Sequence, residues 1–121
     1  MAQDDPINPA HYKKLPKGFG LECIEYTEGF YMSQGTALKY VYRCGNKDSV
    51  EQDLNKTLWY IERTLSNSSV LNMMDFDPEK LRTIEIYATL RTELFYLIAR
   101  GDLHVAKELI HEIIDRNLDL E

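Results

Sequence analysis

One stretch near the middle of the chain, residues 35–63, carries side chains whose types and spacing suit the binding of a small anion. Its basic residues are Lys39, Arg43, Lys47, Lys56 and Arg63, and its aromatic residues include Tyr40, Trp59 and Tyr60. Arginine binds phosphate oxygens through a fork of N–H groups, lysine supplies a point charge, and aromatic rings stack on bases. The combination predicts a site for a phosphate-bearing ligand that also carries a ring.

The same cations also have a purely structural interpretation, which is that they form surface salt bridges. The carboxylates available for such pairs are Glu22, Glu25, Glu51, Asp53 and Glu62. Each exposed pair would contribute only about 0–1 kcal/mol to stability. Composition by itself leaves both interpretations open. The chain contains no G-x-x-x-x-G-K-[ST] loop, which excludes an ordinary P-loop kinase.

The histidines and cysteines are the remaining residues that could do chemistry. His11 and Tyr12 follow an Asn8-Pro9 turn, and His11 is a candidate ligand contact or proton-transfer group. His104 and His111 share one face of a predicted helix, where a solvated face is favoured over a metal site. Cys23 and Cys44 have no metal-ligand spacing and are expected to be small core residues. No metal site is therefore predicted from these residues.

Two predicted helices must position the basic residues. On a helical wheel over 36–44, Ala37, Leu38, Val41, Tyr42 and Cys44 form a core face, with Thr36, Lys39, Tyr40 and Arg43 opposite. Gly45-Asn46 is a helix stop, because both residues tolerate the left-handed conformation. A capping box at Asp48 or Ser49 starts a helix that runs to Leu65, and Trp59 falls outside its apolar stripe.

The rest of the chain also reads as helical. Residues 21–31 and 77–101 are predicted helices, and 102–118 follows after one or two residues, so 77–118 should form an antiparallel helix hairpin. Three prolines predict an irregular arm over residues 1–20. The expected fold is all-α, with about five helices in one domain over residues 1–121 that ends in this 77–118 hairpin.

Charge and composition limit the function. The net charge is −6, with residues 1–60 carrying 7 basic against 8 acidic side chains and residues 61–121 carrying 7 against 12. General nucleic-acid binding is not expected, because it requires a basic footprint. No stretch has the roughly 20 apolar residues of a membrane span, so we expect a cytoplasmic protein. The wide apolar stripes of the last two helices and the off-core Trp59 predict a homo-oligomer.

Four blocks of this sequence resemble a small phage-encoded family, the SaV-like proteins, often described as nucleotide-kinase-like. The resemblance covers residues 8–65 and rests on the order and spacing of these blocks: Asn8-Pro9-x-His11-Tyr12, Leu21-Glu22-Cys23-Ile24-Glu25, Gly35-x-Ala37-Leu38-Lys39-Tyr40-x-x-Arg43-x-Gly45-x-Lys47, and Asp53-Leu54-x-Lys56-x-x-Trp59-Tyr60-Ile61-Glu62-Arg63. Two positions depart from the family pattern, with Thr36 where Asn is usual and Asn46 where Lys is usual.

The resemblance implies a bacteriophage protein that acts in the host cytoplasm as a nucleotide-binding protein or an atypical (deoxy)nucleoside monophosphate kinase. Residues 8–65 would form its nucleotide-binding core. Carried over position by position, the pattern marks candidate ligand-binding residues: Asn8, His11, Tyr12, Lys39, Tyr40, Arg43, Lys47, Lys56 and Trp59. His11 would be the catalytic proton-transfer group. A kinase of this kind would hold Mg²⁺ through Glu22, Glu25 or Asp53, whereas a binding protein needs no cofactor.

Two other functions remain open. The same pocket without chemistry would suit a protein that sequesters a nucleotide second messenger of host anti-phage defence. The acidic 77–118 hairpin would instead suit a protein-binding inhibitor of a host factor.

Overall fold

The computed structural model describes residues 15–67 and 76–121. Within these ranges the chain forms five α-helices and one 3-10 helix, and no strand is present. The elements are α1 (Cys23–Thr27), α2 (Met32–Tyr42), α3 (Val50–Leu65), the 3-10 helix η3 (Pro78–Thr83), α4 (Leu90–Ala99) and α5 (Leu103–Arg116). The predicted all-α fold and the C-terminal helix pair are confirmed. Asn8, His11 and Tyr12 lie outside the described residues.

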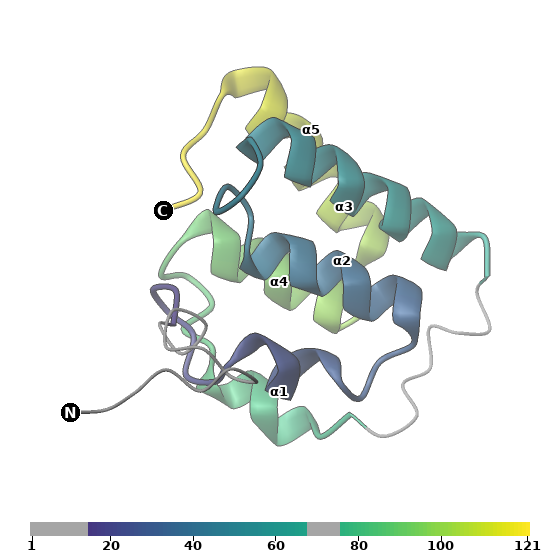
Figure 1. The fold of residues 1–121 in the computed structure, drawn as a ribbon, viewed down its shortest axis with the longest axis vertical. Helices are drawn as coiled ribbons and strands as arrows, with labels where there is room; N and C mark the ends of the chain where they lie inside the picture. Colours follow the sequence, from purple (N-terminus) through teal and green to yellow (C-terminus); the bar gives the residue numbers. More distant parts are fainter. Residues whose placement is uncertain (1–14, 68–75) are drawn as a thin grey trace.

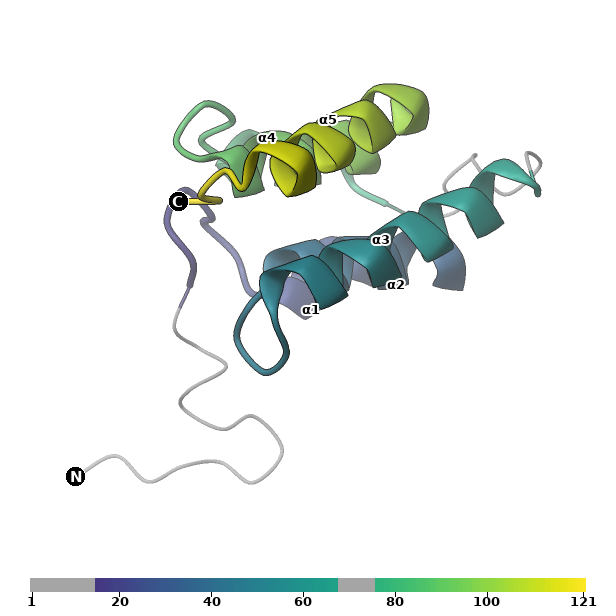
Figure 2. The same cartoon turned by 90° about the horizontal axis from the view of Figure 1, so that it is seen from above.

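The helices form two layers (Figures 1 and 2). In Figure 2, α4 and α5 lie together as an antiparallel pair over a layer made of α1, α2 and α3. The element contacts agree, with α4 packed on α2 and α5 packed on α3. The predicted core face of α2 is confirmed, because Ala37, Leu38, Val41, Tyr42 and Cys44 are all buried in the common core.

The layer interface uses the apolar stripes of the last two helices. Leu94, Phe95 and Ile98 of α4 and Ile110 and Ile113 of α5 are buried within the chain. These five side chains are therefore not available at the surface, and self-association stays a prediction. The other part of that expectation, the position of Trp59 off the core face, is confirmed, because 61% of its surface is exposed.

The prediction of one continuous helix over 77–101 is wrong in the middle of that range. This segment divides into η3 and α4, and Tyr87, which lies between them, is 90% exposed. The break has a tertiary cause. The backbone N–H of Glu85 donates to the Gly18 carbonyl (2.8 Å) instead of to a helical carbonyl. A reciprocal capping box between Thr89 and Thr92 then starts α4.

The first two helices also differ from prediction at their boundaries. The expected helix over 21–31 is reduced to α1, because Gly29 lies against the backbone of Phe76, where a Cβ would come within 2.5 Å of the Phe76 Cα. The second helix begins at Met32 rather than Thr36, so Gly35 lies inside it and brings α2 close to Thr27. The predicted N-cap at Ser49 is confirmed, since its hydroxyl accepts the Gln52 N–H (3.1 Å).

No helix in the described ranges is long and apolar enough to cross a membrane.

Candidate functional site

The end of α2, the turn after it and the first half of α3 enclose a pocket of about 240 Å³, which we call the cationic pocket. It is lined by Lys39, Tyr40, Arg43, Lys47, Asp48, Asp53 and Lys56. Four of the five predicted cations therefore meet at one place. The fifth, Arg63, lines a different depression, together with Trp59 and Tyr60.

The turn that closes the cationic pocket depends on a glycine and a buried aspartate. Gly45 has φ +84°, in the left-handed region that glycine adopts without strain. Its N–H donates to the Asp53 carboxylate (2.8 Å), which is 5% exposed. The turn is therefore fixed from the α3 side, and this contact sets where Arg43 and Lys47 enter the pocket.

Charge in the cationic pocket is unbalanced toward positive. Its lining contains four basic and two acidic side chains. Asp48 forms an ion pair with Lys56 (3.3 Å), and this hydrogen bond raises the pKa of the Lys56 ammonium. Asp53 is already occupied by the Gly45 N–H. Both carboxylates are thus engaged by groups of the protein, and the pocket keeps a net positive charge.

The predicted salt bridges do not form at these positions. Within the described ranges, none of the proposed carboxylates forms an ion pair with Lys39, Lys47 or Lys56. Glu62 pairs instead with Lys107 of α5. The structural alternative is therefore wrong in its partners for these three lysines. Glu62 pairs with α5, and Glu25 and Asp53 accept backbone N–H groups.

Aromatic rings flank the cationic pocket on the α3 side. Tyr40 stacks on Tyr60, with ring centroids 5.8 Å apart and planes inclined by 21°, and Tyr60 meets the edge of Trp59 at 5.0 Å. The ammonium groups of Lys56 and Lys39 lie 5.5 and 5.9 Å from the Tyr40 centroid. Tyr40 is thus held by its neighbours as a wall of the pocket, whereas the indole of Trp59 remains exposed.

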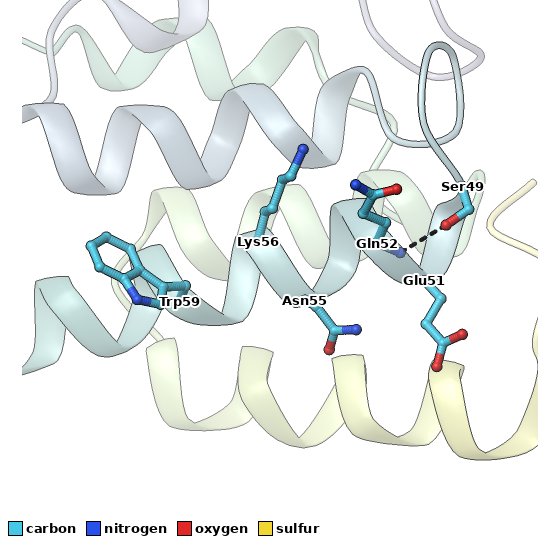
Figure 3. A pocket seen from close by; sticks show the side chains of 6 residues that line it. All are labelled: Ser49, Glu51, Gln52, Asn55, Lys56 and Trp59. Atoms are coloured by element: carbon cyan, nitrogen blue, oxygen red, sulfur yellow. Dashed lines mark hydrogen bonds between the residues drawn. The ribbon is translucent and has the colours of Figure 1, made fainter.

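A shallow groove along α3 adjoins the cationic pocket. It has a volume of about 490 Å³ and is lined by Ser49, Glu51, Gln52, Asn55, Lys56 and Trp59. Figure 3 shows Lys56 and Gln52 projecting to one side of α3, Asn55 and Glu51 to the other, and Trp59 one turn further along. Lys56 lines both the groove and the cationic pocket, so the two adjoin at this side chain.

The two departures from the family pattern lie away from the cationic pocket. Thr36 does not line it. Asn46 lines a separate depression of about 470 Å³ on another side of the turn, together with Arg91 and Glu121. Neither substitution therefore removes a side chain that lines the cationic pocket.

The carboxylates proposed for magnesium are engaged elsewhere. Glu22 and Glu25 form the reciprocal capping box of α1. Asp53 holds the Gly45 turn. Among the described residues no group of three histidine, cysteine, aspartate or glutamate side chains is arranged to hold a metal ion, and His104 and His111 are exposed on α5.

The two cysteines are buried or half-buried thiols, as expected. Burial raises the pKa of both Cys23 and Cys44 to about 11. At neutral pH both are protonated, and the thiolate is the nucleophilic form. Neither is therefore suited to nucleophilic chemistry.

Sequence reasoning missed three residues around this site. Asp48 was considered only as a helix cap and Asp53 only as a salt-bridge or magnesium partner, yet both line the pocket. The signal for Asp53 was its position in the first turn of α3, just after the glycine turn whose N–H groups need an acceptor. Arg91 gives no sequence signal, because its carbonyl partners lie 47 to 50 residues away along the chain and Glu121 lies 30 residues away.

Comparison with known protein families gives one match. Residues 7–62 match DUF3310, a family of proteins of unknown function. The matched segment contains every residue that lines the cationic pocket and the α3 groove, and it ends before α4 and α5. No curated protein and no solved structure matches the chain. The match therefore relates residues 7–62 to an uncharacterised family, and the resemblance to the SaV-like, nucleotide-kinase-like proteins stays a prediction.

Proposed function

We propose that the cationic pocket binds the phosphate groups of a nucleotide. The observation that carries the proposal is the meeting of Lys39, Arg43, Lys47 and Lys56 in one pocket whose two carboxylates are already engaged. Anionic oxygens are the ligands that such a set of donors recognises.

The volumes of the pocket and the groove suit a ligand whose phosphates and ring bind in different places. Pockets for drug-sized ligands measure roughly 300–1,000 Å³. The cationic pocket, at about 240 Å³, falls below that range and suits the phosphates alone. The ring would lie in the α3 groove, against the exposed indole of Trp59, and Lys56 would contact the ligand where the two join.

The same site is compatible with binding alone or with phosphoryl transfer. Binding alone is favoured by one observation: the two carboxylates of the pocket are engaged, so neither is a ready proton acceptor. A phage-encoded protein with such a site could sequester a nucleotide second messenger. Phosphoryl transfer would use the cations to neutralise charge on the transferred group and would take its proton-transfer residue, His11, from outside the described residues.

A thermal-shift screen over mono-, di- and cyclic nucleotides tests the proposal. Since a ligand that binds only the folded chain raises its melting temperature, at least one nucleotide should give a saturable rise, about 2.7 kcal/mol in stability at a hundredfold excess over Kd. Recovery of the best radiolabelled nucleotide intact after denaturation would identify binding alone, and a new labelled product would identify an enzyme. No shift with any nucleotide would contradict the proposal and favour the protein-binding alternative.

A further inference from the structure

The cationic pocket lies at the C-terminal end of α2, and the C-terminus of a helix does not by itself favour an anion. The last four carbonyls of an α-helix have no partner within it, and they give the C-terminus a partial negative charge. Arg43 is the C-cap of α2, so the pocket lies at this negative end. The backbone N–H groups of Arg43 and Cys44 already donate to the Lys39 and Val41 carbonyls. Further donors at this end would reduce its negative potential and favour phosphate beside it.

Arg91 of α4 supplies hydrogen-bond donors to this end of α2. Its Nη1 donates to the carbonyls of Val41 (2.8 Å) and Tyr42 (3.2 Å), and its Nη2 donates to the carbonyl of Cys44 (3.1 Å). Only 7% of the Arg91 side chain is exposed. A buried positive charge therefore covers the last turn of α2 and the residue that precedes the Gly45 turn.

The guanidinium is itself held in place by Glu121. The Glu121 carboxylate accepts from Nε (2.9 Å) and Nη2 (2.5 Å) of Arg91, and the Arg91 N–H donates to the Leu120 carbonyl (3.1 Å). Both N–H groups donate to the same oxygen, Oε1, and this pair of bonds orients the fork and with it the three donor bonds to α2. It also neutralises the buried charge.

The turn that carries Arg43 and Lys47 is thus held by hydrogen bonds on two sides. Arg91 holds the carbonyls on one side, and Asp53 holds the Gly45 N–H on the other. Arg91 does not line the cationic pocket. Its effect on a ligand would therefore pass through the geometry of the turn and through the potential at the end of α2.

We propose that Arg91, oriented by Glu121, is a positioning residue for the cationic pocket, and that the C-terminal helix pair supplies it to the segment matched by DUF3310. This inference rests on the proposed function, because the pocket it serves is the proposed phosphate site. Loosening the Arg91 fork should weaken phosphate binding although no ligand-contacting side chain has changed.

The structure offers a matched control in Lys80. Its ammonium caps α1 in a similar way, donating to the Glu25 carbonyl (2.7 Å) and to the Glu28 carboxylate (3.0 Å). Lys80 belongs to η3 and does not line the cationic pocket. Its removal costs helix-capping bonds without affecting the Gly45 turn.

The experiment compares the wild-type chain with Arg91→Lys, Glu121→Ala and Lys80→Gln, using inorganic pyrophosphate as the binding probe. Arg91→Lys keeps the charge but loses the fork, and we expect its Kd to rise about tenfold. Glu121→Ala keeps the arginine and should raise Kd about threefold. Lys80→Gln should lower the melting temperature and leave Kd unchanged. The Glu121 variant keeps the test decisive if Arg91→Lys fails to fold, because the Glu121 side chain is 48% exposed and its loss disturbs the core less than loss of the buried Arg91.

Amide hydrogen exchange at Gly45 and Lys47 supplies a readout that needs no ligand. Exchange is compared at the same interval below the melting temperature of each variant. Under that condition, the Gly45 amide should exchange faster in Arg91→Lys and in Glu121→Ala than in Lys80→Gln. Unchanged pyrophosphate affinity and unchanged Gly45 exchange in these variants would overturn the inference. If the wild-type chain binds neither pyrophosphate nor any nucleotide, the proposed function fails, and the exchange data alone then decide whether Arg91 holds the turn.

Discussion

The two lysines of the cationic pocket that have no acidic partner allow the sharpest test of phosphate binding. We consider the double variant Lys39→Gln, Lys47→Gln. Neither ammonium forms an ion pair with a carboxylate in the described ranges. Substituting both should therefore change the free energy of unfolding by only about 0.5 kcal/mol, which corresponds to roughly 2 °C in melting temperature.

The expected cost to binding is much larger. A hydrogen bond between a charged group and its partner contributes about 1.5–3 kcal/mol when buried. Both lysines are exposed, so solvent screening reduces this to about 1 kcal/mol each. The double variant should thus lose about 2 kcal/mol of binding free energy, which is a rise of about thirtyfold in Kd.

Calorimetric titration with the nucleotide that gives the largest thermal shift would measure this loss. The matched control is Arg82→Gln, Arg116→Gln, which removes the same total charge from two exposed arginines paired with Glu79 and Glu112, outside the pocket. The control should bind as tightly as the wild-type chain. Equal Kd values for the pocket variant, the control and the wild type would refute the assignment of the phosphates to this pocket.

Three further predictions concern the ring site, the turn and the thiols. Trp59→Ala should weaken binding of a nucleotide about tenfold, since base stacking is worth about 1–3 kcal/mol, and should leave pyrophosphate affinity unchanged; because Trp59 is the single tryptophan, its fluorescence in the wild-type chain should change on nucleotide binding, and a constant signal would contradict stacking. Gly45→Ala should lower stability by about 1–2 kcal/mol in chemical denaturation, because φ is +84° and the new Cβ would approach Val50 at 3.0 Å; a variant of wild-type stability would show that the turn can relax. The pKa values of the Cys23 and Cys44 thiols are raised to about 11 in the folded chain, so these thiols should not reduce the free energy of unfolding below about pH 8.5. Between about pH 8.5 and pH 11 this free energy should fall, because the thiols ionise first in the unfolded chain. The melting temperature of a chain with both cysteines changed to alanine should fall less over this range, and an equal fall would assign the effect to other groups.

Much of the first half of the chain follows from local periodicity. The core face of α2 and the N-cap of α3 could be predicted, because each depends on residues within a few positions of one another. The exposure of Trp59 was predictable for the same reason. The joining of cations from both sides of the glycine turn was expected in outline, since a short turn between two helices leaves few arrangements.

The break within 77–101 could not be predicted in this way. Its apolar pattern fits a continuous helix, yet Glu85 donates its backbone N–H to Gly18, which is remote in the sequence. The length of α1 depends in the same way on the approach of Phe76 to Gly29. Helical pattern describes which face is apolar, and it contains no information about which backbone groups a distant segment will take.

The sequence by itself determined the helical class, the core face of α2 and the set of cations near the glycine turn, because these depend on short-range spacing and side-chain type. Only the tertiary structure decided that four of these cations share a pocket whose carboxylates are engaged, and that Arg91 covers the end of α2. The physical reason is that an unpaired buried carbonyl or charge is costly, and the partner that satisfies it is chosen by packing rather than by proximity along the chain.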